Sequence, residues 1–271
     1  MSPESNRFAQ YLRARRAQVK PEDVGFPQDA VRRVAGLKRE EVAELAGISL
    51  EYYTRLEQGQ PYQLSEQVLS GLSRALRLDA DAASYFYRLA LPEPPTRSTG
   101  TPSLSEHIIH LVDGWSDVPV FVEDSNLDIV VANDLSRAIF PFLAPGSNAA
   151  LSMFSVPDEV RALDGWLPLA RACVAGLRFQ ADPNDPRLQE IVGELSVRDP
   201  LFRELWADHH AEPFTSGEID VFVDGFGLVR FDWQMLNVPG GLQMVVWAPA
   251  SGSLAADAID HVRAKLRTEA A

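Results

Sequence analysis

The sequence predicts two domains of different fold class. An all-α domain of five helices is expected in residues 1–91, and an α/β domain with a five-stranded antiparallel sheet in residues 103–271. Apolar residues recur at helical spacing in the first part, and the period changes to that of strands in the second. Between them, residues 92–102 hold four prolines together with Gly, Ser and Thr, a composition that continues neither helix nor sheet. This segment is predicted to be a linker.

The helices of the first domain are expected at residues 5–19, 38–46, 49–57, 65–77 and 80–90. Large apolar residues at helical spacing should fill the core between them. The loop at residues 20–36 is unusually long for such a bundle, which favours a functional role for it. The predicted core residues are Phe8, Leu12, Leu69, Leu72, Leu76, Phe86 and Leu89.

Residues 37–59 (LKREEVAELAGISLEYYTRLEQG) predict a helix-turn-helix. Ala46 and Gly47 permit the close approach and the sharp turn that two crossing helices need. Ser49 is a favourable N-cap for the second helix. The exposed positions of that second helix are expected to be Leu50, Glu51, Tyr52, Thr54 and Arg55.

This segment resembles the Xre-type helix-turn-helix of phage repressors, in which a Gly-hydrophobic-Ser turn precedes the recognition helix and Glu-X-Gly closes it. The resemblance implies an Xre/lambda-repressor-like domain that binds DNA; a helical hairpin without a DNA role is the alternative. Base contacts are then implied for Leu50, Glu51 and Arg55. Phosphate contacts are implied for Lys38, Arg39, Ser49, Tyr52 and Gln58.

The distribution of charge agrees with this division. Residues 1–90 contain 13 Lys/Arg and 12 Asp/Glu, and the remainder contains 12 and 26, so the net charges are +1 and −14. The acidic composition therefore belongs to the second domain, and a basic surface on the first remains compatible with nucleic acid. Basic residues crowd the first part of the chain, and Arg32 and Arg33 among them are further candidates for DNA contacts.

Strands are predicted in the second domain where apolar residues alternate with others and β-branched residues are frequent. A hairpin turn joins the first two strands, and a short helix should follow Asn133 and end near Phe140. The strands are expected at residues 118–122, 127–132, 218–223, 228–236 and 242–248, and longer helices at 158–180, 185–196 and 199–210. Two strands, a block of helices and three strands is the order of a PAS-like sensor domain, with helices over one face of the sheet.

Six motifs are spread over nearly the full length of the chain: PEDVGFP at 21–27, GLKREEVAELAG at 36–47, EYYTRLEQG at 51–59, Ala132-Asn133, DPRLQEIVGELS at 185–196 and FRELWADHH at 202–210. They are similar to the MmyB-like family of transcription regulators, an Xre domain followed by a PAS-like ligand-binding domain. The chain departs from the family at 31–36 (VRRVAG) and 62–65 (YQLS), which concerns phosphate contacts rather than the fold. The resemblance implies a small apolar or amphiphilic, fatty-acid-like ligand between sheet and helices.

Aromatic and large apolar residues are candidates for the lining of such a pocket, although they could equally be core residues. An acidic ligand head would need a buried cation, for which Arg178 and Arg230 are candidates, unless both lie at the surface. His209 and His210 stand at the end of the helix expected at 199–210, where they either interact with its C-terminus or donate to a ligand carboxylate. The candidate lining residues are Phe121, Val131, Phe154, Trp166, Phe202, Leu205, Trp206, Phe231, Trp233 and Met244.

No apolar run is long enough to span a membrane, no signal peptide opens the sequence, and the single cysteine, Cys173, cannot form an internal disulfide. A cytoplasmic protein without membrane contact is expected. No catalytic residue, metal ligand or cofactor is predicted, because His107 and His110 lack the spacing and the glutamate of HExxH. We expect a homodimeric transcription regulator, not an enzyme, that binds a double-stranded DNA operator. The alternative is a second domain that serves only dimerisation or protein interaction.

Overall fold

The computed structural model describes residues 3–27, 34–60, 64–91 and 104–269, so the predicted linker at 92–102 lies outside the described residues. The chain divides into two compact units. Unit 1 comprises Met1–Thr96 with Asp208–Glu212, and unit 2 comprises Arg97–Ala207 with Pro213–Ala271. None of the helices in the described part of the chain combines the length and the apolar composition that a membrane crossing requires.

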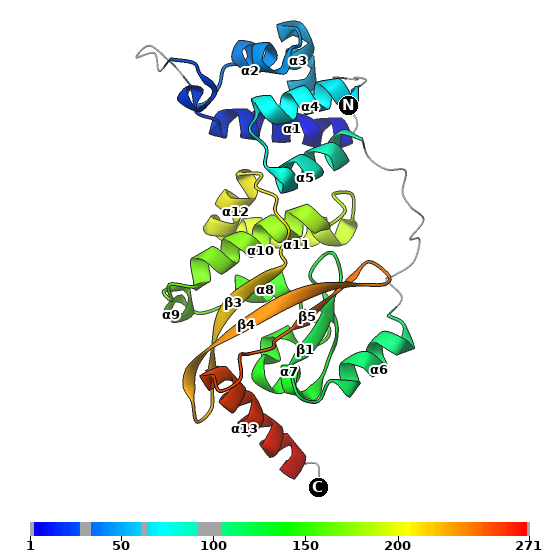
Figure 1. The fold of residues 1–271 in the computed structure, drawn as a ribbon, viewed down its shortest axis with the longest axis vertical. Coiled ribbons are helices and arrows are strands. Elements are labelled where there is room, and N and C mark those ends of the chain that lie inside the picture. Colours follow the sequence, from blue (N-terminus) through cyan, green and yellow to red (C-terminus); the bar gives the residue numbers. More distant parts are fainter. Residues whose placement is uncertain (1–2, 28–33, 61–63, 92–103, 270–271) are drawn as a thin grey trace. The chain divides into compact units, whose positions relative to one another are not determined.

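Unit 1 contains the five predicted helices, and Figure 1 shows them in chain order. Six of the seven predicted core residues have fully buried side chains, and only Leu89 is half-buried. The rings of Phe8 and Phe86 stack with centroids 5.3 Å apart, which joins the first helix to the last. The helices are α1 (Pro3–Gln18), α2 (Arg39–Ala46), α3 (Leu50–Glu57), α4 (Glu66–Ala75) and α5 (Ala80–Ala90), with a 3-10 turn at Pro21–Val24.

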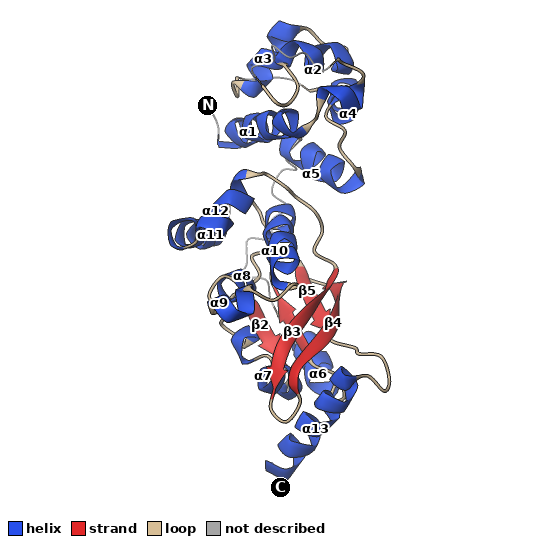
Figure 2. Ribbon diagram, turned by 90° about the vertical axis from the view of Figure 1, so that its left-hand side faces the viewer, coloured by secondary structure: helices blue, strands red, loops and turns tan. Residues whose placement is uncertain are grey.

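Unit 2 is built on one antiparallel sheet of five strands, as predicted, and the strand order is β2-β1-β5-β4-β3. Figure 2 shows the strands twisted together as one sheet. Val120 of β1 lies opposite Val246 of β5, and Ile219 of β3 lies opposite Phe231 of β4. The strands are β1 (Val120–Glu123), β2 (Ile129–Ala132), β3 (Ser216–Val223), β4 (Gly227–Val238) and β5 (Leu242–Val246).

The helices of unit 2 differ from the prediction in two respects. The single helix expected at 158–180 is two helices, because Pro168 cannot stand in a helix interior and a new helix must begin shortly before it. Helices α6, α8 and α13 are not among the predicted elements. The helices are α6 (Glu106–Gly114), α7 (Asp134–Ile139), α8 (Ala149–Met153), α9 (Asp158–Arg161), α10 (Trp166–Gln180), α11 (Pro186–Arg198), α12 (Pro200–Ala207) and α13 (Leu254–Glu269), with a 3-10 turn at Pro141–Leu143.

Helices cover both faces of the sheet, whereas the sequence predicted helices over only one of its faces. On one face, Ile108 and Val112 of α6 pack against Val120 and Val122 of β1. On the other face, the apolar core includes residues of α7, α10 and α13. A third cluster lies among α8, α10, α11 and α12. The sheet is therefore a buried layer, and the side chains on its two faces enter different cores.

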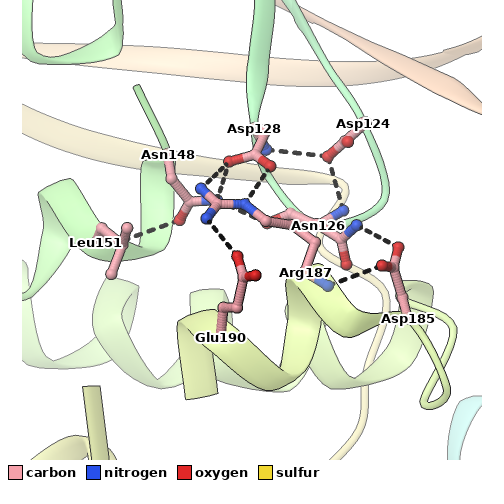
Figure 3. A network of polar contacts seen from close by, with 8 residues as sticks. All are labelled: Asp124, Asn126, Asp128, Asn148, Leu151, Asp185, Arg187 and Glu190. Carbon is pink, nitrogen blue, oxygen red and sulfur yellow. Dashed lines mark hydrogen bonds and ion pairs between the residues drawn. The ribbon is translucent and has the colours of Figure 1, made fainter. Parts of the chain in front are cut away.

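A polar network fastens the β1–β2 turn to α8 and α11 (Figure 3). Asp128 accepts hydrogen bonds from Arg187 Nε at 2.7 Å, Arg187 Nη2 at 2.8 Å and Asn148 Nδ2 at 2.9 Å. Asn126 Nδ2 donates to Asp185 at 2.7 Å, and Asp185 also caps α11. Burial works to raise the pKa of Asp128, but the hydrogen bonds from Arg187 and Asn148 outweigh it and lower that pKa.

We predict that Arg187→Ala lowers the free energy of unfolding of unit 2 by about 1 kcal/mol, a small value because the arginine side chain is 40% exposed. Because the pKa of Asp128 is lowered in the folded protein, the ion pair contributes its full stabilisation at pH values above the ordinary aspartate pKa of about 4. This stabilisation is lost as the pH falls through the lowered pKa. Urea unfolding monitored by tryptophan fluorescence at neutral and acidic pH measures it. Glu190→Gln, which removes only an exposed partner of Arg187, is the control; an equal loss in both variants would contradict the prediction.

Candidate DNA interface and ligand cavity

Helix α3 presents the predicted DNA-reading residues on its outer side. Leu50 is 47% exposed, which is unusual for a leucine, and Glu51 and Arg55 are exposed beside it. Tyr52 is half-buried, and Ser49 and Gln58 are exposed at the two ends of the helix. The opposite side of α3, with Tyr53 and Leu56, is fully buried. The helix therefore has one face in the core and one face available to a partner.

The turn before α3 is built as its residues predict. Gly47 has a φ of +69°, a left-handed conformation that glycine adopts without strain, and it ends α2. Ser49 then caps α3, since its hydroxyl oxygen accepts the N–H of Tyr52 at 3.1 Å. A β-carbon on Gly71 of α4 would lie 2.5 Å from the carbonyl oxygen of Ala46, so the crossing of α2 and α4 requires this glycine.

A buried carboxylate holds three helices together behind this surface. Glu57 has a fully buried side chain that accepts from Arg16 Nε of α1 and from Arg39 Nε of α2, each at 2.6 Å. Arg16 also donates to the carbonyl oxygen of Leu37 at 2.9 Å. Burial works to raise the pKa of Glu57, but the hydrogen bonds from the two arginines prevail and lower it. The carboxylate therefore remains ionised and fixes α3 relative to α1 and α2.

The basic residues predicted near phosphates have different environments. Arg39 is half exposed, and its Nε is bound to Glu57, so this side chain contributes to the fold. The side chain of Lys38 is 44% exposed, and its Nζ lies 3.6 Å from exposed Glu40. Arg32 and Arg33 lie outside the described residues.

Unit 2 contains a cavity of about 260 Å³ between the sheet and helices α8 and α10. Its wall is almost entirely apolar, and it includes Phe142, which is 39% exposed, so the cavity reaches the surface. Among the described residues, the wall contains no Lys, Arg or His. The lining residues are Phe121, Glu123, Phe142, Leu143, Ala149, Ser152, Met153, Val156, Val160, Leu163, Gly165, Trp166, Leu169, Cys173, Phe214, Ile219, Asp220, Val221, Phe222, Trp233, Met235, Val245 and Trp247.

Three of the predicted ligand-binding residues line this cavity, namely Phe121, Trp166 and Trp233. Val131 and Met244 instead pack in the core under α6, on the other face of the sheet. Phe231 belongs to the core around Phe140 and Trp247. Phe154, Phe202, Leu205 and Trp206 pack in the cluster around α11 and α12.

The predicted polar contacts to a ligand head also lie elsewhere. Arg178 is buried, and its guanidinium lies 3.8 Å from the ring centroid of Trp206, whose carbonyl oxygen accepts a hydrogen bond from it. Arg230 is exposed and pairs with Asp220 at 2.9 Å. His210 is exposed, with Nε2 3.0 Å from Glu212, and His209 lies beside it in the segment Asp208–Glu212. None of these four lines the cavity.

Glu123 and Cys173 both line the cavity, and neither was predicted from the sequence as a site residue. Burial, assisted by the neighbouring charge of Asp124, raises the pKa of Glu123 to about 8. Burial likewise raises the pKa of Cys173 to about 12, so the thiol is inert at neutral pH. The signal for Glu123 was present in the sequence, because it stands two residues after Phe121 and therefore on the same face of β1.

An exposed helix behind a capped glycine turn, in a chain whose second unit holds an apolar cavity, defines a DNA-binding regulator with a ligand-binding domain. Comparison with protein families agrees: residues 7–85 match a helix-turn-helix domain, and residues 104–261 match the MmyB-like transcription regulator ligand binding domain. Because the second match spans more than half of the chain, the chain belongs to the MmyB-like transcription regulator family. No individually curated protein matches the chain.

We predict that Arg39→Ala lowers the free energy of unfolding of unit 1 by about 1–2 kcal/mol, because buried Glu57 then loses one of its two arginine partners. The lowered pKa of Glu57 implies that the loss is largest above the ordinary glutamate pKa of about 4 and fades as the pH falls through the lowered value. Hydrogen exchange of the α3 amides localises the effect to unit 1. Lys38→Ala is the matched control, and similar exchange rates in both variants would show that the ion pair is unimportant.

Proposed function

We propose that the chain binds its DNA operator as a homodimer, and that a small apolar or amphiphilic molecule, fatty-acid-like in its chain, alters operator affinity by occupying the cavity of unit 2. The observation that carries this proposal is the cavity of about 260 Å³, enclosed by apolar side chains within the family's ligand-binding domain. The volume of the cavity lies just below the ~300 Å³ at which the usual range of ligand pockets begins. The cavity therefore suits a ligand whose hydrocarbon chain is of moderate length.

The DNA contacts are proposed from the exposed side of α3. Arg55 and Glu51 lie one helical turn apart, so both can reach base edges when α3 enters the major groove. Leu50 would make an apolar base contact. Phosphate contacts are proposed for Lys38, Ser49, Tyr52 and Gln58, and in part for Arg39, whose guanidinium also serves Glu57.

The ligand acts on DNA binding only through a difference in its affinity for two states of the protein. A ligand that binds the operator-competent state more tightly promotes DNA binding, and one that binds the other state more tightly releases it. Helix α10 is the element best placed for this role in unit 2, because Trp166, Leu169 and Cys173 all lie on it and line the cavity.

A second candidate function is a unit 2 that serves only as a dimerisation surface. It is favoured by Phe222 of the edge strand β3, which is 74% exposed and lies opposite Leu228, itself 51% exposed. Large exposed apolar side chains side by side are typical of protein contacts. Phe222 also lines the cavity, but this function requires no ligand there, which distinguishes it from the first.

We predict that Arg55→Ala weakens operator binding by about 1–3 kcal/mol at one base position and relaxes the preference there, if Arg55 reads a guanine. Lys38→Ala should instead weaken binding to all sequences alike and reduce the salt slope by about one. Fluorescence anisotropy with operator and scrambled duplexes over a salt series measures both effects. An Arg55→Ala variant that loses the same factor on both duplexes does not read bases through this residue.

We predict that affinity for straight-chain fatty acids, and for the corresponding alcohols, rises by about 0.8 kcal/mol per methylene until the cavity is full, and then falls. Trp233→Leu enlarges the cavity and should move the optimum to longer chains. Trp206→Leu removes the same volume outside the cavity wall and should leave the optimum in place. Calorimetry on the full chain measures the series. Affinities that do not depend on chain length would favour the dimerisation surface.

A further inference from the structure

The cavity wall contains one carboxyl group that the rest of the structure leaves without a partner. Glu123 is the last residue of β1, is 2% exposed and lines the cavity. Its Oε1 atom is fully buried and has no hydrogen-bond partner among the described residues. A buried polar group without a partner is costly, and in a binding site it indicates a group that the ligand satisfies.

The side chain paired with Glu123 across the sheet donates to another residue. Gln243 lies directly opposite Glu123 across the β1–β5 pair, on the same face of the sheet. Its Nε2 donates to Gln180 Oε1 of α10 at 2.7 Å, and neither glutamine is part of the cavity wall. Glu123 therefore contributes to the cavity wall a carboxyl oxygen that lacks a hydrogen-bond donor among the described residues.

Charge balance then distinguishes between classes of ligand head. The second acidic residue of the wall, Asp220, is held by Arg230 through two hydrogen bonds of 2.9 Å. Because the described part of the wall contains no basic residue, a carboxylate ligand would add a negative charge that nothing in the wall neutralises. A protonated amine would instead form an ion pair with Glu123 and supply N–H donors to its oxygens.

We infer that the ligand of this cavity is an amphiphilic amine, whose apolar body fills the cavity and whose protonated nitrogen binds the carboxylate of Glu123. This inference rests on the proposed function, since it names the head group of the ligand proposed there. Trp166 and Trp247 add indole N–H groups that lack acceptors among the described residues. These neutral donors suit a hydroxyl or carbonyl oxygen elsewhere on the ligand, but they carry no charge to balance a carboxylate.

Binding of an amine to Glu123 depends on pH. With its pKa raised to about 8 by burial and by Asp124, Glu123 holds a proton at neutral pH in the empty cavity. An incoming ammonium displaces that proton to solvent. Three other titratable groups lie beside Glu123 or in the cavity wall. Burial raises the pKa of Asp124, and burial raises the pKa of Cys173 to about 12, so this thiol is neutral at the pH values tested. Hydrogen bonds from Arg230 lower the pKa of Asp220. Ile129 of β2 and Gln243 of β5, the strand neighbours of Glu123, do not titrate.

The test uses the full-length protein and three probes with the same dodecyl chain: dodecylamine, dodecanol and dodecanoate, each below its micelle concentration. All five tryptophans lie outside residues 1–91, and three line the cavity, so their fluorescence reports binding to unit 2. Binding is measured at pH 6 and pH 8 for the natural protein, for Glu123→Gln, and for Glu204→Gln, an exposed glutamate on α12 that controls for attraction of the amine to an acidic protein.

The amine should bind at least about tenfold more tightly than dodecanoate at pH 8, and its affinity should rise up to about tenfold per pH unit between pH 6 and pH 8. Glu123→Gln should weaken amine binding at least about tenfold and abolish this pH dependence, while dodecanol binding changes little. Glu204→Gln should change neither the amine affinity nor its pH dependence.

Tighter binding of dodecanoate than of the amine at pH 8, or an unchanged amine affinity in Glu123→Gln, overturns the inference alone. Failure of all three probes to bind overturns the proposed ligand function as well.

Discussion

The side chains of a β-strand alternate between the two faces of its sheet, and the cavity of unit 2 depends on this constraint. On β1, Val120 and Val122 enter the core under α6, whereas Phe121 and Glu123 point to the cavity. Helix α6 covers one face with aliphatic side chains, and the cavity lies on the other face, toward α8 and α10. A register slip of one residue would place Glu123 under α6, in an apolar core with no space for a ligand. The pairing of β1 with β2 and β5, which the network around Asp128 supports from the turn, therefore determines the chemistry of the site.

The same constraint explains how far the sequence predicts the second unit. The five strands were predicted within a few residues, because alternation and β-branched composition are local signals. Alternation divides each strand into two sets of side chains, but it does not say which set meets the cavity. Met244 was chosen for its size, yet its neighbour Val245 lines the cavity. Helix α6, which decides between the two faces, was not predicted. Three of the aromatic candidates line the cavity, while Glu123, the residue with the most specific chemistry, was not among the candidates.

The first unit was more predictable because its signals are short-range. The turn at Gly47 and the cap at Ser49 are each specified by one or two residues, and the outer face of α3 follows from them. The ion pairs of Glu57 were not anticipated, since they join residues 41 and 18 positions apart along the chain. They change the interpretation of Arg39, because a basic residue near DNA can hold the fold and contact a phosphate with the same guanidinium. A loss of DNA binding on its substitution therefore has two causes that only a stability measurement separates.

A buried acid in an apolar cavity also limits how the two units can be coupled. Keeping Glu123 neutral avoids a buried charge, but an apolar cavity and an unsatisfied carboxyl group both reduce the stability of the ligand-free state. Binding of the proposed ligand would remove both costs, and the stabilisation that it provides would grow with ligand concentration by mass action. This stabilisation changes operator affinity only to the extent that it differs between the DNA-bound and the free protein. By linkage, operator DNA must then change ligand affinity by the same factor, whichever direction the regulation takes.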